Sequence, residues 1–419
     1  MSVVIDKIRN TFNREYTENP IFTLFLAILL LFFVMFILAA IITGGESILS
    51  VLIKEDTFMD HFNSIMDSSD RPYSRGEVIY PPLATIFYII IGNITIPFVD
   101  VTGDLTAGML RDSQMGIMSL ILLILVVFYA LHLIYHRIMK VNDIKKELMF
   151  LFLILLSYPF LFAVERGNNI LLALVFSFLF LLGYRSENRI IRYTSYFALG
   201  CAAGLKLYPA ILALLIVRDR RYKEAAICMS IVAATVLLPF VFTDGNPIML
   251  MDTIFSYTNT HPGSFNINQL SLAVFQDFFG FSHETGSIIG FTITSVFTIL
   301  SFAVILFDRR MKFWKILALL SCNLVLGFGL GCPYQMIYMT MPILFFLVSE
   351  KEMTKENLFF TICFAMTMAL IPGIIFHNNW MVTGCIESMF AIIIAIALIY
   401  EGLRRIFRDR SIDVDRVEQ

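Results

Sequence analysis

Apolar runs long enough to cross a bilayer recur along the whole chain, and they constrain its fold more than any other feature. The first of them, residues 21–44, contains no charged side chain, and about 20 apolar residues are enough to span the hydrocarbon core as a helix. The chain is 58% hydrophobic and only 15% charged, whereas soluble domains carry about 25% charged residues. We therefore predict an all-α polytopic membrane protein.

Basic residues predict how these runs are oriented. Lys7, Arg9 and Arg14 precede the first run, so segment 1–20 is expected in the cytoplasm. Following the charges gives about twelve transmembrane helices within 21–400 and a cytoplasmic tail, 401–419. In this topology 25 of the 31 Lys and Arg residues lie on inner segments and 6 on outer ones, as the positive-inside rule expects. The protein is predicted to lie in the plasma membrane.

Two long outer loops interrupt the apolar runs. The first, 45–112, contains an apolar stretch, 83–97, that is short for a full crossing. A crossing there would also place the basic run that begins at Arg137 outside, so we expect a re-entrant or juxtamembrane helix. The second outer loop is 244–286. Between 192 and 218 either one span crosses or two short spans turn near 204–209, and basic runs at both ends favour the turn.

Carboxylates in the first outer loop are the candidate catalytic groups. Asp60 lies close to the membrane, and Asp56 and Asp67 are alternatives at similar positions. One of them can act as a general base, although most loop carboxylates are simply solvated. The polar part of this loop that precedes the apolar stretch ends at Tyr80-Pro81-Pro82, where two prolines stiffen the entry into the next helix or merely mark its first turn.

Two further segments carry polar groups at the membrane. Glu165-Arg166-Gly167-Asn168 joins two apolar runs; Arg166 can pair with Glu165, Asn168 can cap the next helix, or the tip can meet a polar ligand. Lys206 has apolar neighbours and no acidic residue within ten positions on either side. An anion at the outer leaflet is one expected partner, and snorkelling to the interface is the alternative.

The other polar residues and the cysteines give weaker indications of function. His261, Asn268 and Gln269 lie in the second outer loop, where such side chains suit hydroxyl-bearing ligands or ordinary turns. Glu387, within the last predicted span, receives no role. The six cysteines show no metal-ligand spacing, so we predict neither a disulfide framework nor a metal site. The net charge of −2 excludes a nucleic-acid footprint.

Several short motifs occur in one order and together resemble glycosyltransferase family 87. They are Asp60-His61-Phe62-Asn63, Pro72-Tyr73, Tyr80-Pro81-Pro82-Leu83, Glu165-Arg166-Gly167-Asn168, Gly204-Leu205-Lys206-Leu207-Tyr208-Pro209 and Asn268-Gln269-Leu270-Ser271. The resemblance covers roughly residues 20–350. It implies a GT-C-type fold with juxtamembrane helices in the first outer loop, and a mannosyltransferase that uses a polyprenyl-phosphate sugar on the extracytoplasmic face.

The resemblance also implies the site. Asp60 is the expected base for an inverting displacement at the sugar, and outer-side cations are expected to meet the leaving phosphate. The expected substrate-binding residues are Lys206, Arg166, Glu165, Asn168, Tyr80, Tyr208, His261, Asn268 and Gln269. The implied partners are the lipid-linked donor, a lipid or glycan acceptor and membrane lipids. No cofactor is implied, and the sequence does not determine whether a divalent metal is needed.

Two other classes of protein fit the hydropathy pattern. A twelve-span secondary transporter is the first, but such transporters place their polar groups on broken helices at the membrane midplane and show internal repeats, which we do not find in this sequence. A non-catalytic membrane protein of envelope assembly is the second. Turnover of a polyprenyl-phosphate sugar by the purified protein distinguishes the enzyme from both.

Overall fold

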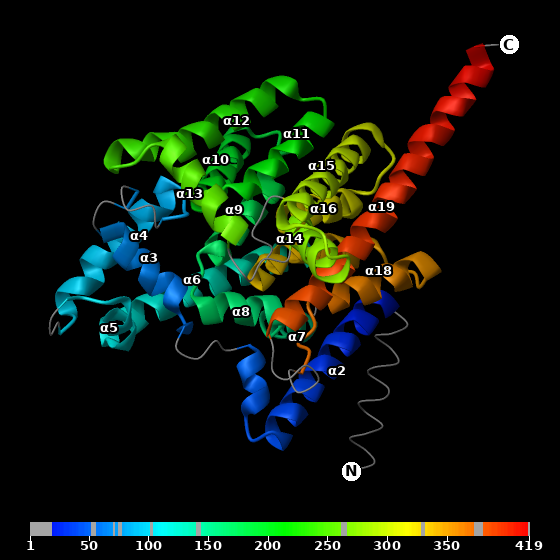
Figure 1. Cartoon of the computed structure of the whole chain (residues 1–419). Helices are drawn as coiled ribbons and strands as arrows, with labels where there is room; N and C mark the ends of the chain where they lie inside the picture. The colour runs from blue at the N-terminus through cyan, green and yellow to red at the C-terminus, as the bar shows by residue number, and fades with distance from the viewer. Residues whose placement is uncertain are drawn as a thin grey trace. The chain divides into compact units, whose positions relative to one another are not determined.

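The computed structural model describes residues 19–51, 56–69, 72–73, 78–100, 104–139, 144–260, 266–327, 332–372 and 380–417. Throughout these ranges the chain forms helices joined by turns, and no strand occurs among them (Figure 1). The predicted all-α fold class is confirmed. Helices are what long apolar segments must form, because a helix satisfies its backbone hydrogen bonds internally.

The chain divides into two compact units. The first comprises Met1–Val51, Tyr135–Leu161 and Phe265–Gln419, and the second comprises Leu52–Ile134 and Phe162–Ser264. The first unit holds α2 (Pro20–Ile42), α7 (Ile144–Leu155), α14 (Ile267–Ala273), α15 (His283–Phe307), α16 (Phe313–Cys322), α17 (Thr340–Ser349), α18 (Lys355–Met366) and α19 (Trp380–Val417). The second holds α3 (Met59–Ser69), α4 (Pro82–Thr95), α5 (Ala107–Asp112), α9 (Ile170–Gly183), α10 (Arg189–Leu205), α11 (Leu214–Arg218), α12 (Tyr222–Leu237) and α13 (Pro247–Thr260). Two of the four boundaries between the units fall within helices, namely α6 (Gln114–Met139) and α8 (Tyr158–Arg166).

Five helices in the described part of the chain are long and apolar enough to cross a membrane. They are Pro20–Ile42, Gln114–Met139, Tyr222–Phe242, His283–Phe307 and Thr383–Arg408. A sixth candidate is the pair Lys145–Leu155 and Tyr158–Arg166, which meet at a 60° bend. Twelve crossings stay a prediction, because the other apolar segments are helices of 10–17 residues.

Local sequence explains where these helices begin and bend. Asn19 accepts a hydrogen bond from the Phe22 amide (3.1 Å) and Pro20 follows it, which is a favourable start for α2. The bend between α7 and α8 has a local cause. Pro159 lies in the first turn of α8, where a missing N–H is tolerated, and it cannot continue α7.

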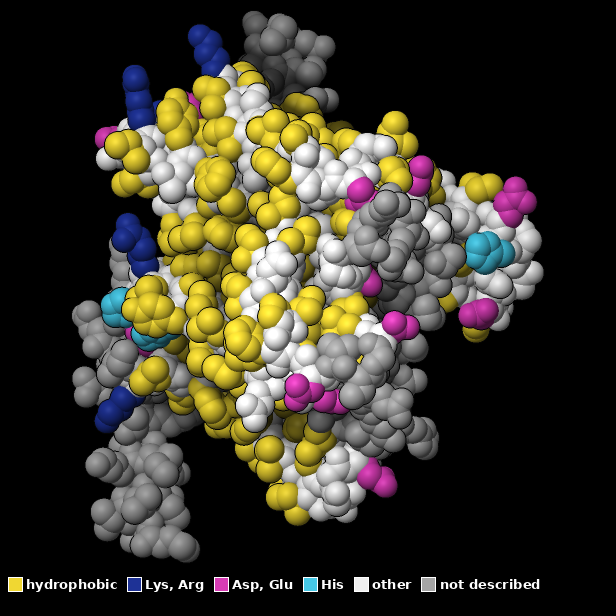
Figure 2. All heavy atoms as spheres, turned by 90° about the vertical axis from the view of Figure 1, so that its left-hand side faces the viewer, with side chains coloured by type: hydrophobic (Ala, Val, Ile, Leu, Met, Phe, Trp, Pro, Cys, Tyr) yellow, Lys and Arg dark blue, Asp and Glu magenta, His cyan; other side chains and the backbone are white. Residues whose placement is uncertain are grey.

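The predicted outer loops are themselves helical. The first contains α3, α4 and α5, and the second contains α13 and α14. Within 192–218, α10 ends at Leu205 and a 3-10 turn begins at Tyr208, so the helix breaks beside Lys206, as the predicted turn requires. Figure 2 shows hydrophobic side chains over much of the drawn face, with charged side chains mainly at its margins.

A buried ion-pair network holds several helices of the first unit together. The ammonium of Lys315, which is almost fully buried on α16, lies 2.6 and 2.8 Å from the two carboxylate oxygens of Glu401 on α19. Arg405, one turn further along α19, donates to Asp308 at the end of α15 (2.8 Å). Glu387 is also buried in α19, and neither of its oxygens bonds to another described residue.

Candidate functional site

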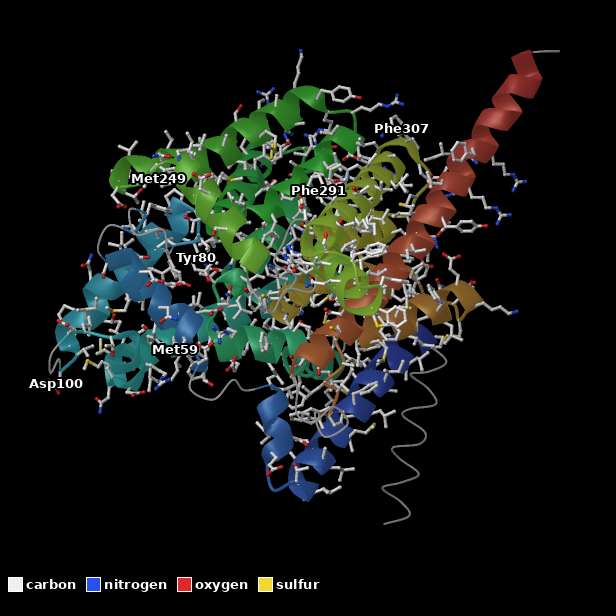
Figure 3. All side chains as sticks on the ribbon, viewed as in Figure 1. Met59, Tyr80, Asp100, Met249, Phe291 and Phe307 are labelled. Atoms are coloured by element: carbon white, nitrogen blue, oxygen red, sulfur yellow. The ribbon has the colours of Figure 1, made fainter. Side chains whose placement is uncertain are left out.

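Helix α3 presents one polar face and one apolar face. Asp60, Asn63, Ser64, Asp67 and Ser68 recur at helical spacing and line a pocket of about 230 Å³, together with Val78, Ile79 and Tyr80. The other face of α3 buries Phe62 and Ile65 in an apolar cluster of the second unit. Figure 3 labels Met59, which begins α3, and Tyr80, which lines the pocket. Burial of the apolar face therefore keeps the polar face turned to the pocket.

Arg166 joins the carboxylates of Asp56 and Asp60. Its Nε lies 3.1 Å from Asp60 Oδ1 and its Nη2 donates to the same oxygen, while its Nη1 donates to the Asp56 carboxylate. The Asp56 side chain is half exposed, whereas Asp60 is 18% exposed. Pairing of Arg166 with Glu165 was one interpretation of the sequence. In the structure Arg166 pairs with Asp56 and Asp60, which lie more than 100 positions away.

Asn168 fixes the other oxygen of Asp60. Its Nδ2 donates to Asp60 Oδ2 (2.7 Å), and its Oδ1 accepts from the Ile170 amide (3.0 Å) at the start of α9. The Asn168 side chain therefore bonds to the first backbone amide of α9 and orients Asp60 at the same time. Because both carboxylate oxygens receive charged or amide donors, the Asp60 side chain is held in one orientation at the pocket wall.

Glu165 holds the segment that leads into α3. It is 3% exposed, and its Oε1 accepts from the Thr57 hydroxyl (3.0 Å). Its backbone carbonyl accepts from the Phe58 amide (2.6 Å), and Phe58 adopts a left-handed φ of 65°. A non-glycine residue in this conformation is unfavourable by itself. The contacts to Glu165 therefore stabilise the turn that places Asp60 in the first turn of α3.

Gly167 allows the two segments to approach closely. It has a φ of +64°, and a Cβ built on it would lie 2.9 Å from the Cβ of His61. Both observations require glycine, first because other residues rarely adopt this φ and second because a methyl group would overlap the backbone-proximal part of His61. The Arg166–Asp60 contact depends on this close approach.

We expect Gly167→Ala to destabilise the protein by about 2 kcal/mol or more, because backbone strain and overpacking add. Gly44→Ala is the matched control, since Gly44 has a φ of +61° and nothing lies within 4 Å of the position that its new methyl group would occupy. Thermal unfolding of the two variants in detergent separates the effect of the His61 contact on stability from the effect of backbone strain. Equal loss of stability in both variants would show that the His61 contact contributes nothing.

His61 lies on the buried side of α3, next to Asp60. The Ser119 hydroxyl donates to the Gly116 carbonyl (2.7 Å), so Ser119 Oγ accepts from His61 Nε2–H (3.3 Å). Burial lowers the pKa of His61 to about 4. The imidazole is therefore neutral at physiological pH, and its contribution to stability is lost as the pH falls below about 6.5, where the unfolded chain binds the proton first.

Lys206 is the second buried cation of the second unit that the sequence singled out. It is 8% exposed at the end of α10, and its Nζ lies 4.1 Å from the ring centroid of Tyr80. This is a cation–π geometry. Tyr80 also lines the pocket, so Lys206 contacts a residue of the pocket wall. Tyr208 begins the 3-10 turn two residues later.

Tyr73 holds Tyr80 in place. The Tyr73 hydroxyl donates to the Tyr80 carbonyl (2.8 Å) and lies 2.9 Å from the Thr85 hydroxyl. Burial raises the pKa of Tyr73, so the hydroxyl remains a donor. Asp244 accepts from the Tyr73 amide (3.2 Å), which ties this part of the first outer loop to the start of the second.

An apolar groove of about 610 Å³ lies in the same unit. Its walls are residues of α4 and α6, among them Phe87, Ile91, Met118 and Leu122. Ser119 is one of its few polar lining residues, and it is the residue that bonds to His61. The groove wall is thus connected through one hydrogen bond to the residue beside Asp60.

Three of the predicted site residues belong to the second outer loop. Asn268 and Gln269 lie on α14, in the first unit, where Asn266 caps the helix by accepting from the Gln269 amide (2.8 Å). His261 lies outside the described residues. The structure thus joins Asp60, Arg166, Asn168 and Glu165 in one contact network, and it joins Lys206 with Tyr80.

Sequence reasoning missed the pocket-lining role of Asn63, Ser64 and Ser68 and the anchoring role of Tyr73. The polar residues at 60, 63, 64, 67 and 68 follow a helical repeat that was there to be found. Tyr73 was singled out only as part of the Pro72-Tyr73 motif, without a role. Among the described residues no group of three or more His, Cys, Asp or Glu side chains could hold a metal ion.

These observations define the class of the molecule. It is a helical membrane protein in which a carboxylate is oriented at the wall of a polar pocket, and the same unit contains an apolar groove. Its family follows from sequence comparison, since the family model described as Glycosyltransferase family 87 matches residues 79–333, more than half of the chain. The chain belongs to glycosyltransferase family 87 and is a membrane glycosyltransferase. No curated protein and no solved structure matches it. The family does not favour the transporter or the non-catalytic alternative.

Proposed function

We propose that the chain transfers mannose from a polyprenyl-phosphate donor to an acceptor hydroxyl on the extracytoplasmic face of the plasma membrane. The observation that carries this proposal is the Asp60 carboxylate, oriented by Arg166 and Asn168 at the pocket wall. An oriented, partly exposed carboxylate is the group that a displacement at a sugar carbon needs as its base. Family membership supplies the reaction class.

The reaction is a single displacement. The acceptor oxygen attacks the anomeric carbon and loses its proton to Asp60, while the bond between that carbon and the phosphate oxygen breaks and leaves its electron pair on the phosphate. A β-linked donor thereby gives an α-linked product. Asp60 is favoured over Asp56, whose carboxylate is half exposed and does not line the pocket.

The leaving phosphate needs a nearby cation. Lys206 is proposed for this role, because it is a buried cation whose ammonium lies against Tyr80, a residue of the pocket wall. We therefore assign Lys206 to the donor phosphate and Arg166, with Glu165 and Asn168, to positioning Asp60. Tyr80 contacts Lys206 in space, and Tyr208 follows it by two positions in the sequence. Both are proposed to border the donor.

The apolar groove is proposed to hold the first part of the polyprenyl tail. Its α4 wall begins at Phe87, five residues after Pro82, which is roughly 8 Å along the helix. Tyr80, whose ring contacts the Lys206 ammonium, lies two residues before the start of this helix. A lipid whose phosphate lies at Lys206 can therefore run along α4 with its chain on apolar side chains.

Purified protein in detergent tests the reaction. We expect polyprenyl-phosphate mannose to be consumed, with release of polyprenyl phosphate and transfer to n-octyl α-mannoside. The same incubation with polyprenyl-phosphate glucose measures sugar specificity. If no polyprenyl-phosphate sugar is consumed, the proposed donor class is wrong.

Topology is tested independently of catalysis. We expect a cysteine at Ser69, an exposed position on α3, to react with an impermeant thiol reagent added to intact cells, and a cysteine at Ser186 not to react. The native chain, whose six cysteines are buried or half-buried, gives the background. Labelling of Ser186→Cys alone would place the polar pocket on the cytoplasmic side.

A further inference from the structure

A basic surface lies at the end of α10 opposite to Lys206. Arg189 begins this helix and Lys206 follows its last residue, so the two cations are about 25 Å apart along the helix. Two segments form the basic surface, 184–192 and 218–222, and together they contain six arginines and two acidic residues. The second unit therefore carries a concentration of positive charge that is separate from the proposed active site.

Ion pairs join the two segments. Helices α10 and α12 pack side by side (Figure 1). Arg185 donates to both carboxylate oxygens of Asp219 (2.8 Å each), and Arg192 lies 3.2 Å from Glu224 on α12. A bidentate pair of this kind fixes the geometry of the groups that it joins. The two segments therefore form one surface, in which the Asp219 carboxylate is already used by Arg185.

Two arginines of the basic surface are available to a ligand. Arg189 and Arg220 are exposed, and no described residue forms a hydrogen bond or ion pair with either guanidinium. Arg189 lies four positions after Arg185, and Arg220 directly follows Asp219. A guanidinium presents its N–H donors as a planar fork that matches two oxygens of a phosphate. The basic surface thus offers two such forks to an anion.

Arg220 occupies a position at which glycine is favoured. Helix α11 ends in a Schellman motif, in which the Arg221 amide donates to the Ile216 carbonyl (3.2 Å) and the Arg220 amide donates to the Val217 carbonyl (2.9 Å). Arg220 has a φ of 58°, a left-handed conformation that is unfavourable for residues other than glycine. Arg220→Gly therefore removes the guanidinium and the backbone strain together, so it tests the side chain without endangering the fold.

An exposed apolar stripe adjoins the arginines. Ile190, Tyr193 and Phe197 are exposed and recur at helical spacing along α10, beginning next to Arg189. Tyr222, also exposed, begins a helical segment that is long and apolar enough to cross a membrane. Tyrosines at the ends of such segments lie at the boundary between lipid and water. The arrangement suits a lipid whose headgroup meets the arginines and whose acyl chain lies on the stripe.

We propose that the basic surface binds an anionic phospholipid, with Arg189 and Arg220 contacting the headgroup phosphate and an acyl chain lying on Ile190, Tyr193 and Phe197. The positive charge favours anionic over zwitterionic lipid, and the apolar stripe favours a lipid over a soluble phosphate. The site does not depend on the identity of the sugar donor. In the predicted topology it faces the cytoplasm, whose leaflet carries anionic lipids.

Thermal unfolding of the full chain in detergent, titrated with phosphatidylglycerol, measures this binding. Phosphatidylglycerol should raise the melting temperature until the site is saturated, because a ligand that binds only the folded state stabilises it. Phosphatidylcholine and inorganic phosphate at the same concentrations should have little effect. A response to inorganic phosphate equal to that of phosphatidylglycerol would overturn the lipid assignment, and equal responses to the two lipids would overturn the charge argument.

Single substitutions assign the contacts. Arg220→Gly should leave the melting temperature without lipid unchanged or higher, and it should raise the half-saturating concentration of phosphatidylglycerol roughly fivefold, the factor expected of one cation at an anionic surface. Arg189→Gln should raise it by a similar factor. Lys355→Gln, which removes an exposed cation of α18 in the first unit, is the control and should match the native protein. Native affinity in both arginine variants overturns the proposal.

Fluorescence quenching locates the bound lipid. Tyr222→Trp adds a fluorophore beside the arginines, and its signal is the difference from the native protein. Brominated phosphatidylglycerol should quench this signal more strongly than brominated phosphatidylcholine at the same mole fraction, and the difference should shrink at high salt. Adding Arg189→Gln and Arg220→Gly should remove the difference. Equal quenching by the two lipids in the otherwise native chain would show that the anionic lipid binds elsewhere.

Discussion

Asp60→Asn should reduce sugar transfer by roughly a hundredfold or more, the contribution expected of a general base, while the donor still binds. The amide keeps the size of the side chain and can still accept from Asn168, but it cannot take the acceptor proton. Transfer rate and donor affinity are measured separately on the purified variant. The structure makes this prediction specific, because Asp60 alone among the three candidate carboxylates both lines the pocket and receives Arg166.

Matched variants distinguish Asp60 from its neighbours. Asp56→Asn removes the charge of the half-exposed partner of Arg166, and it should reduce sugar transfer less than Asp60→Asn does. Asp112→Asn removes an exposed carboxylate of α5, outside the pocket, and should leave transfer unchanged. Full activity in Asp60→Asn, together with a large loss in Asp67→Asn, would assign the base to Asp67 and reject the mechanism proposed above.

Lys206→Gln should weaken donor binding and slow transfer together. The phosphate gains negative charge as the sugar bond breaks, so a cation that contacts it stabilises the transition state more than the ground state. Lys206→Arg should restore only part of the activity, since a planar guanidinium does not reproduce a compact ammonium above the Tyr80 ring. Donor affinity and kcat with polyprenyl-phosphate mannose are the measurements.

Lys223→Gln is the control for Lys206→Gln, because Lys223 is an exposed lysine of α12 in the same unit. Tyr80→Leu tests the ring itself and should lower donor affinity through loss of the cation–π contact. If Lys206→Gln binds and turns over the donor as the native protein does, Lys206 is only a snorkelling side chain and the phosphate must be met elsewhere.

The class of the protein was predictable from the sequence because hydropathy and charge act over short stretches. A run such as 21–44 must be helical in lipid whatever surrounds it, and the basic residues at the ends of such runs orient them. The polar character of the first outer loop, the break beside Lys206 and the family motifs are likewise local properties. Each was therefore accessible before any tertiary contact was known.

The choice among carboxylates was not accessible in this way. Asp56, Asp60 and Asp67 have the same chemistry and lie within twelve positions of each other, so local sequence does not rank them. Arg166 and Asn168 distinguish Asp60 from the other two because they bond to its carboxylate. They come from more than 100 residues away, through a close contact that only Gly167 permits. Such contacts depend on how helices pack, which periodicity and composition do not encode.

Local sequence was thus enough to predict that the chain is helical, lies in a membrane and carries a polar segment with candidate catalytic carboxylates. Tertiary contacts were needed to show that Arg166 pairs with Asp60 instead of Glu165, that one face of α3 lines a pocket, and that Lys206 packs on Tyr80. The difference lies in the range of the interactions. Helix formation and membrane insertion depend on neighbouring residues, whereas a site is assembled from side chains that are distant in sequence.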